Sequence, residues 1–325
     1  MRRLSFAELR ELSAGALAFG EEDGGLAFFK CTGEQLEEVG RSFPNGMTSA
    51  RATTGVRLDF VTDSPGIAFA FARGSALELL VDGVLIRRWA PAPRERTEID
   101  LDEVFPAGRG REKRRVTLVF GSHGENAVPL YLEIGEGKSA ARQTYGRKLL
   151  FIGDSLTQGW HSRFDVNSWA WRTSLFLNAD SVIQGIGGDR FRPGAVQPLP
   201  FEPDMVFVAL GTNDFTLFED KEEFLGRLRE TMARLAALYR GKPVIAITPT
   251  PRFDGETRPA GDHTLFRSLI AREAEKYGFL PVDGASLIPA DEAFFADVVH
   301  PNDDGFSLFA ENLWRILRKE GRLAF

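Results

Sequence analysis

A serine that can act as a nucleophile follows a short apolar segment near the middle of the chain. Residues 149–152 are an unbroken apolar run, which Gly153-Asp154-Ser155 interrupts. Such a run predicts a buried parallel strand that leads into a helix, and ligands of open α/β sheets bind at this carboxyl end. Free N–H groups at a helix start favour the negative charge that serine attack creates. Taken alone, the motif is equally consistent with a helix N-cap at Ser155.

An acid and a histidine near the C-terminus have a spacing suited to proton transfer. Asp297 precedes His300 by three residues, so one loop can bring the carboxylate to the imidazole. A histidine takes a proton from serine when a third group fixes its tautomer, and Asp297 can do this. The alternatives are a surface salt bridge or half of a metal site, although the sequence has no His-Glu-x-x-His and no cysteine cluster. His161 is a weaker candidate base because it lies just past Ser155 on the same predicted turn.

Two further predicted strand ends carry groups that can hold an oxyanion. Residues 185–189 (Gly-Ile-Gly-Gly-Asp) form a glycine turn in which the N–H of Gly188 can approach a ligand closely. The turn is not a dinucleotide-binding loop, because Arg190 stands where Gly-x-Gly-x-x-Gly needs its third glycine. Asn213, in Gly-Thr-Asn-Asp, has a side-chain NH₂ that can donate to the same oxyanion. A plain turn at Gly188 and an Asx turn at Asn213 are the alternatives.

The elements that must position these groups follow an α/β pattern in the second half of the chain. Apolar strand-like segments alternate with helical ones, and residues 221–239 place their apolar side chains on one helical face. The predicted strands are residues 149–152, 182–184, 205–210, 244–247 and 280–282. Strands that alternate with helices predict a parallel sheet with right-handed crossovers.

The first half of the chain has a different period. From about residue 26 to 137, apolar and polar residues alternate, and Asp82-Gly83 between two apolar segments predicts a hairpin. Short strands joined by polar turns, with no helical pattern between them, predict an antiparallel sandwich. We therefore expect a β-sandwich domain at 1–137 with a short helical and then loose leader at 1–25, a linker at 135–142, and a second domain at 138–325.

Composition argues against nucleic-acid and membrane partners. The 325 residues carry a net charge of −6, and the one basic segment, 109–115, contains a glutamate and favours a solvated loop over a phosphate-binding patch. Cys31 is the only cysteine, so an internal disulfide is excluded. Because we find no apolar leader and no apolar run of membrane-spanning length, we expect a cytoplasmic protein. Secretion stays open if a leader has been removed.

The four motifs together resemble the sequence blocks of the SGNH (GDSL) hydrolases. The blocks, in the family's order, are Gly153-Asp-Ser-Leu156, the glycine turn with Gly188, Gly-Thr-Asn213-Asp, and Asp297-x-x-His300-Pro. Each block alone is weak, but four in the correct order on successive strand ends are specific. The resemblance covers about residues 146–325. One departure is Ile183, at a position where the family often has an asparagine.

The resemblance implies a flavodoxin-like, three-layer α/β/α domain that hydrolyses acyl or acetyl esters without a metal or an organic cofactor. By position, Ser155 would be the nucleophile, His300 the base, and Asp297 the group that orients the imidazole. The N–H groups of Ser155 and Gly188 and the side chain of Asn213 would form the oxyanion hole. The combination with an N-terminal, jelly-roll-like β-sandwich is similar to that in some bacterial carbohydrate acetylesterases.

Three functions remain open, and the sequence leaves homo-oligomerisation open as well. The first is removal of O-acetyl or other short acyl groups from sugars, with Trp160 as the candidate sugar contact just past the nucleophile. At least one of Trp169 and Trp171 is expected in the core instead. The second is a lipolytic esterase, lysophospholipase or thioesterase for longer chains, which the lack of an apolar lid segment disfavours. The third is a carbohydrate-binding protein without catalysis, against which the intact Ser155 and His300 argue.

Overall fold

The chain divides into two compact units. The computed structural model describes residues 1–323 except positions 75, 105–112, 125 and 256. Unit 1 comprises Met1–Thr32 and Arg51–Tyr145, and unit 2 comprises Gly33–Ala50 and Gly146–Phe325. This division differs from the one predicted at residue 137, because the first unit extends to Tyr145 and residues 33–50 belong with the second.

Unit 2 is built on a five-stranded parallel sheet. Its strands are β13 (Arg147–Gly153), β14 (Ala179–Gly185), β15 (Met205–Ala209), β16 (Val244–Ile247) and β19 (Leu280–Val282). They lie in the order β14-β13-β15-β16-β19, and every neighbouring pair is parallel. The predicted parallel sheet is confirmed, and its strand order is that of flavodoxin-like folds.

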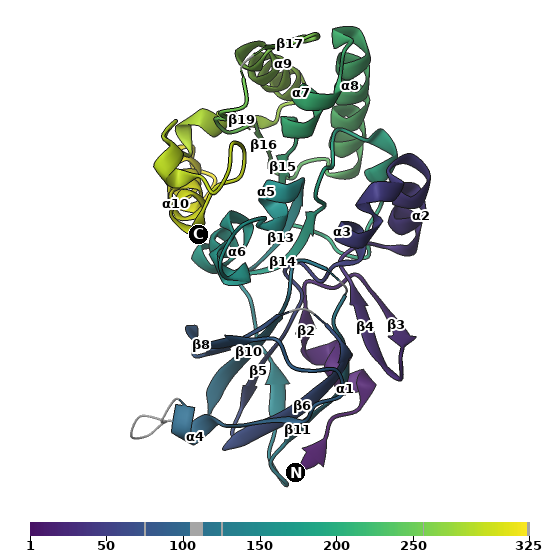
Figure 1. The fold of residues 1–325 in the computed structure, drawn as a ribbon, viewed down its shortest axis with the longest axis vertical. Coiled ribbons are helices and arrows are strands. Elements are labelled where there is room, and N and C mark those ends of the chain that lie inside the picture. Colours follow the sequence, from purple (N-terminus) through teal and green to yellow (C-terminus); the bar gives the residue numbers. More distant parts are fainter. Residues whose placement is uncertain (75, 105–112, 125, 256, 324–325) are drawn as a thin grey trace. The chain divides into compact units, whose positions relative to one another are not determined.

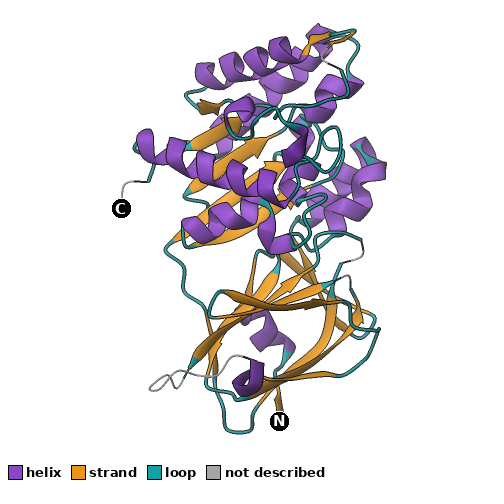
Figure 2. Ribbon diagram, turned by 60° about the vertical axis from the view of Figure 1, so that its left-hand side comes forward, coloured by secondary structure: helices purple, strands orange, loops and turns teal. Residues whose placement is uncertain are grey.

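Helices cover both faces of this sheet (Figures 1 and 2). On one face, α6 (Trp169–Phe176) packs against α10 (Asp303–Lys319), and Trp169 stacks on Phe309 with ring centroids 4.6 Å apart. On the other face lie α8 (Lys221–Leu238) and α9 (His263–Lys276). Phe224 and Phe266 stack between those two helices at 4.5 Å. The result is the expected three-layer α/β/α arrangement.

Polar side chains fix where the helices of unit 2 begin. Asp220 caps α8 by accepting a hydrogen bond from the N–H of Glu222 at 2.7 Å. Asn302 caps α10 by accepting from the N–H groups of Asp304 and Gly305. These caps satisfy N–H groups that have no partner inside the helix. The position of α10 matters for the site, because the Asp297–His300 loop ends directly before it.

Unit 1 contains two antiparallel sheets and one separate hairpin. The first sheet joins β1 (Arg2–Arg3), β11 (Val128–Ile134), β6 (Gly66–Arg73) and β9 (Thr97–Asp100). The second joins β12 (Ala140–Arg142), β5 (Arg57–Thr62), β10 (Arg114–Phe120), β7 (Leu77–Val81) and β8 (Val84–Trp89), with β2 (Ser13–Ala14) beside β5. The hairpin is β3 (Ala18–Glu22) with β4 (Gly25–Phe29), and the short helices are α1 (Phe6–Leu12) and α4 (Leu101–Val104). Apolar side chains from both sheets, among them Leu58, Phe60 and Phe69, form one buried core.

Several local predictions for unit 1 can be compared with the structure. The Asp82-Gly83 hairpin is confirmed, and both residues have the positive φ that its turn requires. The predicted linker is wrong in part, because β12 pairs with β5. In the basic segment, Arg115 pairs with Asp59, whereas positions 109–112 lie outside the described residues.

The prediction that residues 26–137 contain no helix is wrong. Gly33–Ser42 forms α2, Pro44–Gly46 a short 3₁₀ helix (η1), and Met47–Arg51 forms α3. In α2, Gln35 and Val39 are the buried residues, so a polar side chain shares the buried face and the apolar period is weak. This helical segment lies in unit 2 up to Ala50 and contributes to the site described below.

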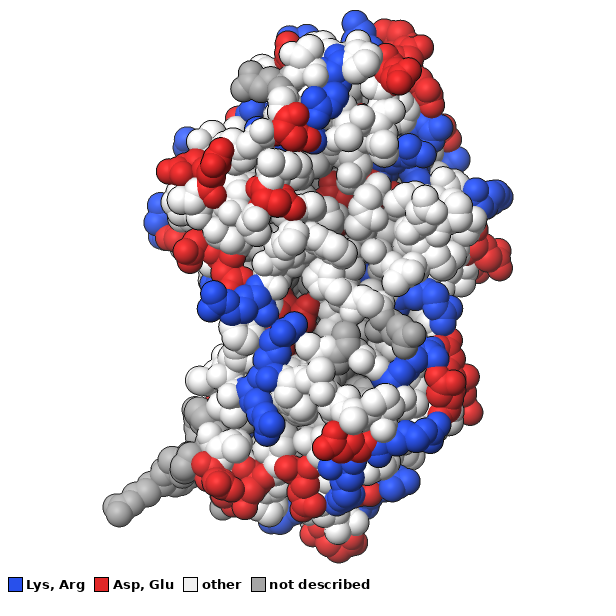
Figure 3. All heavy atoms as spheres, viewed as in Figure 1, with Lys and Arg blue, Asp and Glu red and all other residues white. Residues whose placement is uncertain are grey.

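The surface carries charges of both signs. On the face drawn in Figure 3, acidic and basic side chains are interspersed. Within the described ranges, none of the helices combines the length and the apolar character that a membrane span requires.

Candidate active site

Ser155 lies at the point where the strand order of the sheet reverses. It is the first residue of α5 (Ser155–Gln158), a single turn that follows β13, and β13 is flanked by β14 and β15. Asp154 caps this turn by accepting a hydrogen bond from the N–H of Leu156 at 3.0 Å. The turn packs so closely on β14 that a Cβ on Gly185 would lie 2.3 Å from a backbone nitrogen. Ligands of such sheets bind at this reversal.

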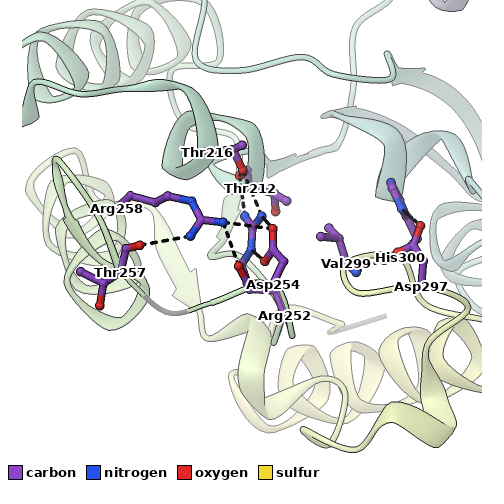
Figure 4. Close-up of polar contacts among 9 residues, drawn as sticks. All are labelled: Thr212, Thr216, Arg252, Asp254, Thr257, Arg258, Asp297, Val299 and His300. Carbon is purple, nitrogen blue, oxygen red and sulfur yellow. Dashed lines mark hydrogen bonds and ion pairs between the residues drawn. The ribbon is translucent and has the colours of Figure 1, made fainter.

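His300 joins Ser155 to Asp297 through its two ring nitrogens. The Oγ of Ser155 lies 2.8 Å from Nε2, and the Oδ2 of Asp297 lies 2.8 Å from Nδ1. The other oxygen of Asp297 accepts hydrogen bonds from the N–H groups of Val299 and His300, at 2.8 and 2.7 Å (Figure 4). One short loop therefore supplies both the imidazole and the group that orients it.

The charge of Asp297 settles which nitrogen of His300 carries the proton. Burial alone would raise the pKa of this carboxyl, but hydrogen bonds from the amides of His300 and Val299 and from the imidazole lower that pKa to about 2. The carboxylate is thus ionised at neutral pH and accepts the proton on Nδ1. The Nε2 lone pair then points to the hydroxyl of Ser155 and can accept its proton.

Gly188 and Asn213 lie together beside Ser155. The side-chain NH₂ of Asn213 donates to the carbonyl of Asp189 at 2.8 Å, which ties Asn213 to the glycine turn. A Cβ on Gly187 would lie 4.0 Å from the Cβ of Ser155, so the turn borders the nucleophile. As the first residue of α5, Ser155 also presents a backbone N–H that has no partner within its helix. The three predicted oxyanion donors therefore gather at one end of β13, β14 and β15.

The glycine turn has a backbone that suits glycine alone. Gly188 has φ of +79°, and a Cβ there would lie 3.1 Å from the ring of Phe43. The turn is held to α7 (Thr212–Leu217), the helix after β15, because the carboxyl of Asp214 accepts a hydrogen bond from the N–H of Phe191 at 3.1 Å. Asp189 forms a bidentate pair with Arg192 at 2.6 and 3.0 Å. These contacts fix the direction of the N–H of Gly188.

Two carboxyl groups are buried beneath the site. Burial, reinforced by the negative charge of Asp189, raises the pKa of Asp154 to about 7 and that of Asp214 to about 8. Arg252 is the nearby cation. It donates to the carbonyl of Thr212 at 3.0 Å and pairs with Asp254 (Figure 4). The structure thus places two carboxyl groups with raised pKa values near the nucleophile.

Residues 33–50 contribute to the site, although no motif in the sequence predicted this. Gln35 of α2 exchanges two side-chain hydrogen bonds with Gln184 of β14, at 3.2 and 2.8 Å, and Ser42 accepts one from Arg192 at 3.0 Å. Phe43 lies against Gly188, and a Cβ on Gly187 would lie 3.2 Å from the Oγ of Ser49. This segment is therefore a wall next to the nucleophile and the glycine turn. Its signal in the sequence is weak because the contacts are polar.

The aromatic residues near Ser155 divide into surface and core. Trp160 is 39% exposed, and its ring centroid lies 6.4 Å from that of His300, so it borders the site as predicted. Trp169 and Trp171 are buried, which confirms the expectation for the core. His161, the weaker candidate base, does not contact Ser155 in any described interaction. Its Nε2 instead lies 3.2 Å from Oδ2 of Asp297.

The segment that contains these site residues matches a known protein family. Residues 151–308 match the GDSL-like Lipase/Acylhydrolase family. The resemblance to the SGNH (GDSL) hydrolases is thereby confirmed, and the hydrolase segment includes Ser155, Gly188, Asn213 and the Asp297–His300 loop. No curated protein matches the chain.

Solved structures with the same fold extend over both units. The salicylyl-acyltransferase SsfX3 from a tetracycline biosynthetic pathway has a TM-score of 0.84 at 19% identity, covering 98% of this chain and 97% of that one. A family two carbohydrate esterase from Clostridium thermocellum, in complex with cellohexaose, has a TM-score of 0.69 at 17% identity, covering 96% and 99%. The family two carbohydrate esterase from Cellvibrio japonicus has 0.67 at 17% identity, covering 97% of each chain. At these identities the likeness shows the fold alone, a parallel α/β domain together with an antiparallel β unit.

Proposed function

We propose that this ester hydrolase removes acetyl or other short acyl groups from carbohydrates through an acyl-enzyme. The observation that carries the proposal is the hydrogen-bonded line from Ser155 through His300 to Asp297, next to Gly188 and Asn213. The Oγ of Ser155 lies 2.8 Å from Nε2 of His300, which is within the reach that proton transfer from a nucleophile to its base requires.

The proposed reaction has two symmetrical halves. The Oγ of Ser155 attacks the ester carbonyl while Nε2 of His300 takes the hydroxyl proton, and Asp297 stabilises the imidazolium. The oxyanion receives hydrogen bonds from the N–H groups of Ser155 and Gly188 and from Asn213. His300 then gives its proton to the leaving alcohol, and water repeats the sequence on the acyl-enzyme. Asn213 already holds one hydrogen bond to Asp189, which keeps its amide oriented before substrate binds.

A carbohydrate alcohol as the leaving group is supported by two observations. Trp160 presents a half-exposed indole beside His300, and aromatic faces with such exposure suit sugar rings. The carbohydrate esterases described above share the fold over both units. The short acyl group is supported by the close approach of Phe43 to Gly188, since it limits the space beside the proposed oxyanion site.

A substrate panel tests this proposal. The purified full-length protein is assayed on acetylated sugars and on a series of esters with acyl chains of two to eight carbons. We expect kcat/KM to fall steeply beyond about four carbons, because forcing a methylene against a packed wall costs about 1–3 kcal/mol. An eight-carbon ester that is hydrolysed faster than the acetate would replace this proposal with the lipolytic one.

Phe43→Ala tests whether this ring limits the length of the acyl chain. Removing the ring opens space beside Gly188, so the variant should accept longer acyl chains relative to acetate than the wild type does. Phe28→Ala, which removes a buried ring in unit 1, is the matched control and should leave the relative preference unchanged. An unaltered chain-length profile for Phe43→Ala would place the acyl group elsewhere.

The panel also includes alcohols as acyl acceptors, because the acyltransferase described above shares this fold. An acyl-enzyme can pass its acyl group to an alcohol as well as to water. We expect hydrolysis to dominate at millimolar acceptor. Transfer that exceeds hydrolysis under these conditions would make an acyltransferase the better description.

A further inference from the structure

Two imidazoles and one carboxylate converge at the outer end of the proposed relay. The Oδ2 of Asp297 lies 2.8 Å from Nδ1 of His300 and 3.2 Å from Nε2 of His161. The rings of the two histidines have centroids 5.4 Å apart, and the three potential ligand atoms all lie within 4.8 Å of one another. The sequence suggested Asp297 and His300 as half of a metal site but not His161 as their partner, because His161 is distant from both in the chain.

These distances approach those of a tetrahedral zinc site. Ligand nitrogens and oxygens lie about 2.0–2.2 Å from Zn²⁺, so neighbouring ligand atoms are roughly 3.3–3.5 Å apart. The two nitrogen-to-oxygen distances above are shorter than that spacing by about 0.1–0.7 Å. Rotation of the exposed side chains of His161 and Asp297 can lengthen them. We propose that His161, Asp297 and His300 bind a divalent cation of the zinc class and that the bound ion switches the hydrolase off.

The chemistry of the three groups favours such an ion over Mg²⁺ or Ca²⁺. Imidazole nitrogens suit Zn²⁺, whereas Mg²⁺ and Ca²⁺ prefer oxygen ligands. Asp297 adds a carboxylate oxygen, which Zn²⁺ also accepts as a ligand. The side chains of His161 and Asp297 are 43% and 38% exposed, which lets a hydrated ion enter and keep a water as its fourth ligand.

The position of His161 is held by its own loop. Gly159 ends α5 with φ of +84°, and the N–H and Oγ of Ser162 both donate to its carbonyl, at 3.0 and 2.8 Å. His161 itself has φ of +69°, which is uncommon for a residue other than glycine. The loop therefore fixes the direction in which the imidazole leaves the backbone, toward Asp297.

Binding of the ion would remove the base by exchanging one N–H bond of His300 for another. The metal takes the lone pair of Nδ1 of His300, so the single proton of the neutral ring moves to Nε2. An Nε2 that carries a proton cannot accept another from the hydroxyl of Ser155. His161 binds through its Nε2 and then carries its proton on Nδ1. Chelation of the metal restores the original tautomer, so the inhibition is reversible.

Binding is tested first on a protein that needs no activity. Isothermal titration calorimetry with ZnCl₂ is performed on full-length Ser155→Ala and on Ser155→Ala with His161→Gln. Glutamine can still hydrogen-bond to Asp297 but has no imidazole ligand. We expect at least a tenfold increase in Kd for the double variant. Equal zinc affinities in the two proteins, with circular dichroism showing both folded, would overturn the site.

Inhibition is tested next, with each variant normalised to its own metal-free rate. We expect micromolar Zn²⁺ to inhibit the wild type, EDTA to reverse this, and Mg²⁺ at the same concentration to have no effect. His161→Gln should raise the half-inhibitory concentration at least tenfold, whereas His123→Gln, in unit 1, should leave it unchanged. Zinc that binds at this site but does not inhibit would overturn the switch. Because the calorimetry requires no esterase activity, failure of the proposed function and failure of this site are distinguishable.

Discussion

The two halves of the site are held in different ways. Ser155, Gly188 and Asn213 follow three neighbouring strands of a buried sheet. Asn213–Asp189 and Asp214–Phe191 hydrogen bonds tie the segments after β14 and β15 to each other, and the N–H of Gly187 donates to Gln158 in the turn of Ser155. The half with the base is a single loop before α10, in which Asp297 is fixed by amides two and three residues further on. The side chain of Asp297 is 38% exposed, whereas Ser155 is 8% exposed.

The geometry of the two halves therefore depends on different kinds of contact. Strand register and glycine packing set the oxyanion half, so a change there disturbs several loops at once. Local hydrogen bonds set the base half, so its residues can be replaced with less effect on the sheet. Substitutions in the two halves should therefore separate loss of chemistry from loss of structure.

The largest effect is expected in the base half. His300→Ala removes the group that accepts the serine proton, and we expect kcat to fall by about 10⁴–10⁶ with little change in KM. The melting temperature should change little, because the loop is held by backbone contacts of Asp297. Steady-state kinetics and calorimetry measure both. A loss of less than a hundredfold would assign the base to another residue.

Asp297→Asn should have a smaller effect in the same half. An asparagine can keep the hydrogen bonds from the amides of Val299 and His300 through its carbonyl oxygen, but it loses the charge that stabilises the imidazolium. We expect kcat to fall by about 10³–10⁴. Activity equal to that of His300→Ala would mean that the loop itself has collapsed, which the amide region of a two-dimensional NMR spectrum would reveal.

Asn213→Ala tests the oxyanion half. Its amide is proposed to act in the transition state, so we expect kcat to fall by about 10²–10³ and KM to stay nearly constant. The matched control is Asn312→Ala, which removes a similar amide-to-carbonyl hydrogen bond, to Leu287 at 3.1 Å, away from the site. If the two variants lost activity equally, Asn213 would be a structural residue only.

The smallest effect concerns the buried carboxyl of Asp154. Burial raises its pKa from 3.8 to about 7, so the folded protein keeps the proton while the unfolded chain loses it. The free energy of unfolding due to this group therefore falls as pH rises from about 4 to 7. Asp154→Asn cannot ionise yet can still accept from the N–H of Leu156. The melting temperature of the variant relative to wild type should rise by about 2–6 °C between pH 5 and pH 8.

The control for this prediction is Asp220→Asn, at the exposed N-cap of α8. Its carboxylate accepts the same type of hydrogen bond, from the N–H of Glu222, in contact with solvent. If the melting temperature relative to wild type changed equally for both variants between pH 5 and pH 8, burial of Asp154 would not be the cause.

Much of unit 2 could be predicted because buried parallel strands have continuous apolar sequences. The predicted segments 244–247 and 280–282 coincide with β16 and β19, and 149–152 lies inside β13. The helix predicted at 221–239 ends one residue earlier, at Leu238. The candidate site followed from the same logic, because polar motifs at the carboxyl ends of parallel strands must meet at one edge.

The elements that escaped prediction have contacts that leave little periodic signal. The buried face of α2 includes Gln35, whose partner Gln184 is far away in the sequence. The backbone of His161 has a positive φ, which helps the imidazole to reach Asp297. No pattern of residue types predicts that conformation. Phe43 is apolar, but only the folded chain shows that it faces Gly188.

The placement of residues 33–50 changes how the units can be studied separately. A fragment of residues 138–325 would leave Gln184 and Arg192 without the contacts of Gln35 and Ser42. It would also lack the wall formed by Phe43. Loss of activity in that fragment would therefore report on this segment as well as on unit 1.

Covalent labelling tests directly whether Ser155 is the nucleophile and His300 its base. A serine-reactive fluorophosphonate is added to full-length wild type, Ser155→Ala and His300→Ala, and the modified peptide is identified by mass spectrometry. We expect one adduct, on Ser155, that forms quickly in wild type, far more slowly in His300→Ala and not at all in Ser155→Ala. Labelling of another serine, or turnover of an acetate ester by folded Ser155→Ala at a rate near that of wild type, would contradict this expectation.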